Sequence, residues 1–222
     1  RRHTRFRNVT GVQTCALPIS SVMVIKDAML SGKFGELQLI RARYGHGGRL
    51  GYEKEWRARR EVSGGGELLD QGSHLIDLAK FLGGDVELNF ADIPTLYWDM
   101  EVEDNAFIAG SFKNGGRAWL HASWTEWKNI FSFEVFFKTA KFEINGLGGS
   151  YGDEKLFIYD MPEGLGIPNL TVHDYPKEDV SWSRELEDVV QHANLGERYN
   201  YTGADWRDAV RVLEIVEEVY GH

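Results

Sequence analysis

The sequence has a single cysteine, Cys15, which excludes a disulfide framework. It has no apolar run near the roughly 18 residues that a membrane-spanning helix needs. Basic residues are outnumbered by acidic ones, 25 against 34, which gives a formal net charge of −9. Such a charge disfavours binding to nucleic acid and to anionic membranes. These absences predict a soluble, cytoplasmic protein with no nucleic-acid or membrane partner.

Residues 1–19 differ in composition from the rest of the chain. They contain four arginines, the cysteine and no acidic residue. They show no hydrophobic period, and Val9 to Ile19 resembles the in-frame translation of a common sequencing adapter. A basic arm or a transit peptide is the alternative, but a targeting peptide needs an apolar or amphipathic core. We therefore interpret 1–19 as non-native and 20–222 as one domain, with 21 basic and 34 acidic residues.

The stretch Gly64 to Asp77 organises the domain. Three glycines lead into apolar residues at helical intervals. Four residues separate Asp70 from His74, so on an α-helix both side chains lie on one face. A carboxylate at that distance can orient the imidazole and favour its protonated form. A surface pair or a buried histidine without a functional role is the alternative. Gly72 between them costs roughly 1 kcal/mol against alanine, which suggests a close approach to the backbone.

The remaining pattern predicts an α+β fold with an open, mainly antiparallel sheet and helices on one face. Several strands follow one another without intervening helices. Lys113-Asn114-Gly115 is a strong hairpin signal. Gly45 to Ser63 is expected to be a long loop, a feature that is often functional. The expected strands are Leu37–Tyr44, Val86–Leu96, Asp104–Phe112, Gly116–Trp124, Phe131–Lys138, Lys141–Asn145, Lys155–Asp160 and Leu170–His173. The expected helices, besides the one carrying Asp70 and His74, are Val22–Leu30, Ser183–Asn194 and Ala204–Tyr220.

Two groups of apolar residues are assigned from this pattern. A stripe on the last helix is expected to be core, and Thr202 with Asp205 resembles a capping box before it. Aromatic residues on the strands are divided evenly between core and a partner surface on the open sheet face. The stripe comprises Trp206, Ala209, Val210, Leu213, Val216 and Tyr220. The aromatic residues are Trp119, Trp124, Trp127, Phe131, Phe133 and Phe137.

Gly-Gly-Gly, three residues, Asp70, three residues, His74, two residues and Asp77 resembles the signature of the C-terminal domain of Gfo/Idh/MocA oxidoreductases. Trp56-Arg57 upstream fits the same pattern, as does Gly35-Glu36 before the first strand. The resemblance implies a fold like the C-terminal domain of glyceraldehyde-3-phosphate dehydrogenase. It also implies hydride transfer between NAD or NADP and a hydroxyl-bearing carbon of a sugar, sugar derivative or cyclitol. Homo-oligomers through the open sheet face are implied as well.

The resemblance also implies roles for individual residues. By this resemblance, His74 is the acid/base residue that exchanges a proton with the substrate hydroxyl. A histidine with a pKa near neutrality suits that task. Asp70 positions and tunes it, and Gly64, Gly65 and Gly66 shape the substrate pocket through backbone N–H groups. Arg57 can meet a phosphate or carboxylate of cofactor or substrate through its planar fork. His46 and Tyr52, in the same loop, are assigned to substrate binding, with a solvated charged loop as the alternative.

Two expected elements of such an enzyme are missing. The chain has no Glu-Lys-Pro lysine motif and no dinucleotide-binding fingerprint. We therefore expect a substrate-side half that is inactive alone, whose cofactor is bound mainly by an absent N-terminal domain. A non-catalytic sugar-binding or oligomerisation module of the same fold is the alternative. We expect no metal, although His46, His121 or His173 could in principle join Asp70 and His74. Glycoside hydrolysis by paired carboxylates stays open, because acidic residues are abundant.

Overall fold

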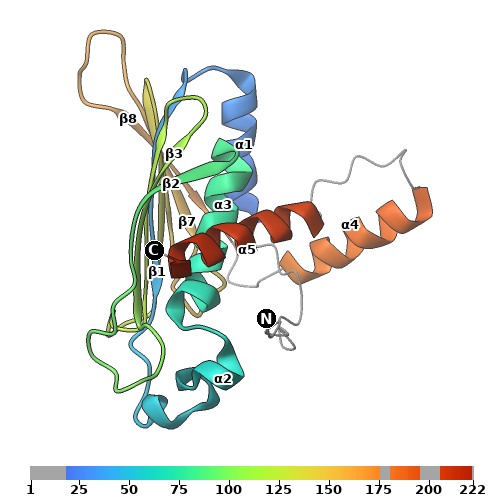
Figure 1. Ribbon diagram of the computed structural model, residues 1–222. Coiled ribbons are helices and arrows are strands. Elements are labelled where there is room, and N and C mark those ends of the chain that lie inside the picture. Colours follow the sequence, from blue (N-terminus) through green and yellow to red (C-terminus); the bar gives the residue numbers. More distant parts are fainter. Residues whose placement is uncertain (1–18, 176–180, 196–205, 222) are drawn as a thin grey trace.

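The computed structural model describes residues 19–175, 181–195 and 206–221. One eight-stranded sheet carries helices on one of its faces (Figure 1). The strands are β1 (Leu37–Gly45), β2 (Val86–Asp92), β3 (Asn105–Phe112), β4 (Arg117–Ser123), β5 (Ile130–Phe137), β6 (Ala140–Asn145), β7 (Lys155–Asp160) and β8 (Asn169–Asp174). The α-helices are α1 (Ser20–Ser31), α2 (Arg60–Ser63), α3 (Ser73–Gly83), α4 (Ser181–Leu195) and α5 (Trp206–Gly221). Three shorter turns are η1 (Tyr52–Lys54), η2 (Trp56–Ala58) and η3 (Leu68–Gly72).

The strands lie in the order β2-β3-β4-β1-β5-β6-β7-β8. Every neighbouring pair is antiparallel except β1 and β4, which run parallel. The predicted hairpin between β3 and β4 is present, and Gly115 in its turn has φ +91°, a conformation that glycine adopts without strain. The α+β class, the mainly antiparallel sheet and the helices on one face are therefore confirmed.

The core lies between the sheet and the helices α1, α3 and α5. Alternate residues of β1 point into it, among them Ile40, which is fully buried. Helix α3 contributes Leu75, Leu78 and Leu82 at helical spacing. Ile19, at the edge of the segment interpreted as non-native, packs in the same core. The rest of that segment lies outside the described residues.

The expected long loop is partly helical, because η1, η2 and α2 lie within Gly45 to Ser63. The strand predicted over Val86 to Leu96 ends at Asp92 instead. Pro94, two residues later, has no backbone N–H to donate to a neighbouring strand. Beyond it, the Asp104 carboxylate accepts hydrogen bonds from the backbone N–H groups of Leu96, Tyr97 and Trp98 at 2.8, 2.8 and 2.9 Å. A segment whose N–H groups are held by a side chain cannot also pair with a strand.

The predicted stripe on α5 is wrong at its first turn. Trp206 and Val210 are exposed, whereas Val212 and Ile215, outside the stripe, are buried beside Val216. The helix therefore buries a face rotated relative to the predicted one. Thr202 and Asp205, the proposed capping box, lie outside the described residues.

The aromatic residues are not divided evenly as predicted. Trp119 and Trp127 are exposed, and the other four are core: Trp124, Phe131, Phe133 and Phe137. The open face is also more charged than expected. Glu134 accepts a hydrogen bond of 2.8 Å from Arg41, and Lys141 Nζ lies 2.7 Å from Glu143 Oε2. The exposed ring of Trp119 and these ion pairs thus share this face, whereas Trp127 lies in the loop between β4 and β5.

Candidate functional site

The three-glycine turn is shaped by the segments that pack against it. Gly64 has φ +82° and ends α2. A Cβ atom on Gly66 would lie 2.0 Å from the backbone oxygen of Glu103, and one on Gly65 would lie 2.0 Å from the Tyr220 hydroxyl. Because real Cβ atoms do not approach other atoms so closely, Gly65 and Gly66 leave no room for a side chain. Close packing inside the chain therefore accounts for both of them.

A carboxylate that the sequence reasoning missed anchors this turn. Glu103 Oε1 accepts hydrogen bonds from the backbone N–H groups of Gly66 and Leu68, at 2.9 and 3.2 Å, and from the Tyr220 hydroxyl at 2.7 Å. Negative charge is stabilising at the start of a helix. The Gly66 N–H, assigned above to a substrate pocket, is thus engaged by Glu103. No local sequence signal links positions 66, 103 and 220.

Asp70 and His74 lie on either side of a change in helix type. Asp70 is in the π-helical turn η3, and His74 is in the first turn of α3. A π turn holds more residues than an α turn and often marks a functional site. The four-residue spacing is therefore not the regular α-helical one that the sequence predicts. The ion pair recorded for Asp70 is with Arg57, whose Nε lies 3.8 Å from Asp70 Oδ2.

The electrostatics of the two residues also differ from expectation. Burial lowers the pKa of His74 from 6.5 to about 4, so its imidazole is neutral at physiological pH. The expectation that a carboxylate favours the protonated form is therefore wrong for this chain. The Asp70 side chain is 44% exposed. Its partly enclosed position raises its pKa, and the charge of Arg57 opposes that rise.

Arg57, Tyr52 and His46, the loop residues assigned to substrate or cofactor, lie near Asp70. The Tyr52 and His46 rings lie 5.7 Å apart, and Tyr52 packs edge-on against Trp124 at 5.2 Å. Burial raises the pKa of Tyr52, and the charge of Asp70 adds to that rise. Burial lowers the pKa of His46, and the charge of Arg57 adds to that decrease. Gly48 N–H donates to His46 Nδ1 at 2.9 Å, which fixes the ring.

Two tyrosines were missed, one beside His74 and the other packed against the first. The Tyr44 ring centroid lies 6.2 Å from that of His74 and 4.8 Å from that of Tyr151. Gln71 Nε2 donates a hydrogen bond of 2.7 Å to the Tyr151 hydroxyl. Burial raises the pKa of Tyr151, while hydrogen bonds with Tyr44 and Gln71 oppose the rise. Tyr44 ends a predicted strand and could have been noticed, whereas nothing local points to Tyr151.

Across the described ranges, no cluster of three or more His, Cys, Asp or Glu residues is arranged to hold a metal ion. None of the described helices combines the length and apolarity needed to cross a membrane. The sequence Gly148 to Gly152 reads Gly-x-Ser-x-Gly, but it lies between β6 and β7. A nucleophile elbow requires a strand followed by a helix, so this motif is not one.

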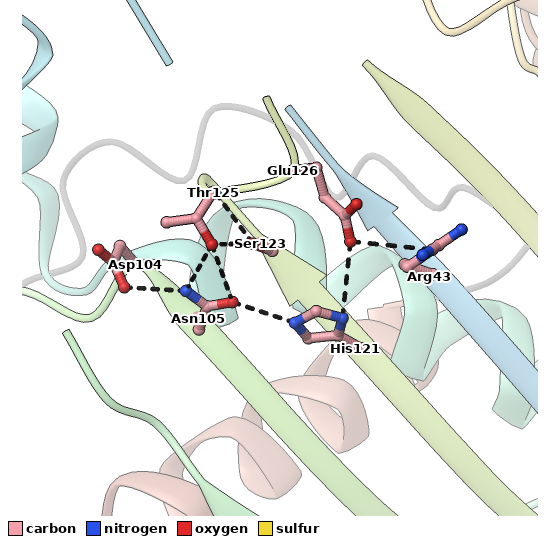
Figure 2. A network of polar contacts seen from close by, with 7 residues as sticks. All are labelled: Arg43, Asp104, Asn105, His121, Ser123, Thr125 and Glu126. Carbon is pink, nitrogen blue, oxygen red and sulfur yellow. Dashed lines mark hydrogen bonds and ion pairs between the residues drawn. The ribbon is translucent and has the colours of Figure 1, made fainter. Parts of the chain in front are cut away.

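His121 lies on the open face of the sheet, away from His74. Its Nε2 lies 3.0 Å from Asn105 Oδ1 (Figure 2). Its Nδ1 lies 3.7 Å from Glu126 Oε1. Glu126 Oε1 also lies 3.8 Å from Arg43 Nε. The His121 ring stacks on Phe107 with centroids 4.4 Å apart. This network is a second polar cluster, and it adjoins the loop of the candidate site, because the Glu126 N–H donates a hydrogen bond of 3.2 Å to the His46 backbone oxygen.

The family model described as the GFO/IDH/MocA C-terminal domain matches residues 22–151. The chain belongs to the Gfo/Idh/MocA family. The predicted family is thereby confirmed, and the match includes β1, the three-glycine turn, Asp70 and His74. No curated protein sequence matches the chain.

Solved structures with the same fold include three oxidoreductases. An aldose-aldose oxidoreductase from Caulobacter crescentus, complexed with glycerol, is 22% identical, with a TM-score of 0.69 over 91% of this chain and 56% of its own. A levoglucosan dehydrogenase, in complex with NADH and L-sorbose, is 17% identical, with a TM-score of 0.71 over 90% and 61%. The WlbA dehydrogenase from Bordetella pertussis, in complex with NADH and UDP-GlcNAcA, is 18% identical, with a TM-score of 0.66 over 90% and 57%. The chain thus spans about three fifths of the length of these structures.

Proposed function

We propose that this chain is the substrate-side domain of an NAD(P)-dependent oxidoreductase that acts on a sugar, sugar derivative or cyclitol. Membership of the Gfo/Idh/MocA family supports this proposal. The observation that carries it is the position of His74 in the first turn of α3, directly after the π turn whose Asp70 is paired with Arg57. Complexes of similar folds with NADH and sugar-type molecules agree with it.

In this proposal His74 acts as the base on the substrate. Oxidation of an alcohol removes the hydroxyl proton as the hydride leaves, and a neutral imidazole can accept that proton. A protonated imidazole could not accept it. The lowered pKa of His74 leaves the ring neutral at neutral pH, and the same low pKa makes it a weaker base than a histidine that titrates near neutrality. The pair of Asp70 and Arg57 sets the charge beside the reacting group, and Tyr52 and His46 contribute to substrate binding.

The nicotinamide would supply the hydride acceptor. The described residues do not fit the whole dinucleotide, because the chain has no glycine-rich fingerprint opening a strand-turn-helix unit. Arg57, whose side chain is 36% exposed, is the residue that we assign to cofactor contact. We propose that the rest of the cofactor, NAD or NADP, is bound by a separate domain and that this chain is inactive alone.

We also propose that copies of this chain associate through the open sheet face. Trp119 is 46% exposed there, although it lies on a central strand. Exposed aromatic residues are enriched at protein interfaces. The ion pairs of Glu134 with Arg41 and Lys141 would form the polar part of such a contact. A cytoplasmic location remains a prediction.

A non-catalytic sugar-binding or oligomerisation module of this fold is the second candidate. Assays of the full-length protein with NAD⁺ and NADP⁺ against sugars and cyclitols separate the two. The enzyme proposal predicts reduction of one cofactor, and the absence of turnover with every substrate would favour the module. Calorimetric titration of the present chain with NADH should show weak or no binding, since it lacks the phosphate-binding turn.

A further inference from the structure

Glu67 is a fully buried acid with an unusual environment. It follows the three-glycine turn and directly precedes η3, and its relative exposure is 0%. Neither of its carboxyl oxygens has a hydrogen-bond partner among the described residues. The Ser123 backbone and the Trp124 side chain lower the pKa of Glu67 as donors would, but Trp124 Nε1 has no hydrogen-bond partner among those residues either.

Two other carboxyl groups adjoin Glu67, and each has what Glu67 lacks. Glu103 accepts three hydrogen bonds through Oε1. Asp70 is paired with Arg57 and is partly exposed. A carboxylate with neither donors, nor a cation, nor solvent is strongly disfavoured in a protein interior. Of these three groups, Glu67 is therefore the one whose neutral form the structure favours.

We propose that Glu67 keeps its proton at neutral pH and is a positioning residue for Asp70. A neutral acid beneath η3 lets Asp70 carry the negative charge that faces Arg57. The inference rests on the proposed function for the role of Asp70, but the protonation of Glu67 does not depend on that role.

The surrounding charges support this assignment. Burial raises the pKa of Glu67 well above its ordinary value. The charges of Asp70 and Glu103 raise this pKa further, whereas the Ser123 backbone and the Trp124 side chain lower it. Glu67 in turn affects groups on other elements, since its charge would raise the pKa of both Tyr52 and Tyr151. Within the described ranges, the titratable groups that interact with Glu67 are thus Asp70, Glu103, Tyr52 and Tyr151, which are acidic or phenolic.

The proposal implies that η3 keeps its geometry only at pH values where Glu67 is protonated. Loss of the Glu67 proton would place a buried negative charge beside Asp70 and Glu103. Repulsion would then disturb the π turn that holds Asp70. Glu67→Gln is the matching neutral variant, because an amide imitates the protonated acid in size and charge.

The test is a ¹³C NMR titration of the carboxyl groups in the present chain, without cofactor or substrate. Through-bond assignment identifies Glu67 in the wild-type chain, so the result does not require a folded variant. We expect Glu67 to titrate at a clearly higher pH than Glu134, whose pKa is lowered because hydrogen bonds from Arg41 and Lys141 outweigh its burial. Ionisation of Glu67 in the same acid range as Glu134 would overturn the proposal.

A second readout separates positioning from space filling. In the wild-type chain, the backbone amide shifts of residues 68–72 should move with the midpoint of the Glu67 titration. That movement should be lost in Glu67→Gln and retained in the control Glu134→Gln. If the amide shifts of residues 68–72 still moved over the same pH range in Glu67→Gln, Glu67 would not be a positioning residue for Asp70. Neither result depends on dehydrogenase activity, so this inference and the proposed function can fail separately.

Discussion

The hydroxyl of Tyr220 donates a hydrogen bond of 2.7 Å to Glu103 Oε1. This bond ties the last turn of α5 to the carboxylate that holds the start of η3. The C-terminal helix thus supports the turn that carries Asp70, although the two are far apart in the sequence.

Tyr220→Phe tests that connection. The change removes the hydroxyl and leaves the ring, so Glu103 loses one of its three hydrogen bonds. We expect the free energy of unfolding to fall by about 2 kcal/mol, the usual cost for a bond to a charged group. The control is Tyr97→Phe, at a residue that is 61% exposed, with an expected change within about 0.5 kcal/mol. Equal effects in urea denaturation would show that the bond contributes little.

Gly66→Ala tests the close packing of the three-glycine turn. The new Cβ would lie 2.0 Å from a backbone oxygen that cannot rotate away. We expect a loss of about 3 kcal/mol or more, or a failure to fold. In the control Gly221→Ala the Cβ meets nothing within 4 Å. Similar thermal midpoints for the two variants would mean that the turn has room to relax.

The pKa of His74 predicts a loss of stability on the acid side. The folded state holds a neutral imidazole down to about pH 4, whereas the unfolded chain takes up a proton near pH 6.5. Stability should therefore be fully present above pH 6.5 and fall as the pH drops toward 4, by up to roughly 3 kcal/mol.

Urea denaturation of the wild-type chain and of His74→Gln between pH 4 and 7 measures this effect. The difference between the two should shrink or reverse in favour of the variant as the pH falls, because glutamine does not titrate. A His74 imidazole signal that titrates near pH 6.5 in NMR would be inconsistent with a buried, neutral ring.

Trp119→Glu tests association through the open sheet face. A charge in the middle of that face should weaken self-association about tenfold or more, measured by analytical ultracentrifugation. Trp56→Glu is the control, because Trp56 is similarly exposed at 50% but lies in η2, outside the sheet. An unchanged sedimentation profile in Trp119→Glu would place the contact elsewhere.

Features fixed by local chemistry could be predicted from the sequence. The hairpin predicted at Lys113-Asn114-Gly115 is present, because Gly115 takes the positive φ that the turn requires. The helix α1 ends at Gly32, which has φ +66°. Both depend on residues that are adjacent in the chain.

Features fixed by distant residues could not be predicted in this way. The backbone N–H groups of Leu96, Tyr97 and Trp98 are bonded to the Asp104 carboxylate and not to a neighbouring strand. Asp70 lies in a π turn whose start is held by Glu103, and Tyr151 reaches Gln71 from another element. The loop and helix residues assigned to the candidate site could be named from the sequence, but the distant residues that contact them could not.

The most direct test of the central claim is the turnover of the full-length protein with His74→Ala. We predict that turnover falls by about 10²- to 10⁴-fold, the usual contribution of an acid/base group. The thermal midpoint and the affinity for the nicotinamide cofactor should stay close to wild type. Near-normal turnover of a folded, cofactor-binding His74→Ala variant would contradict the assignment of His74 as the residue that accepts the substrate proton.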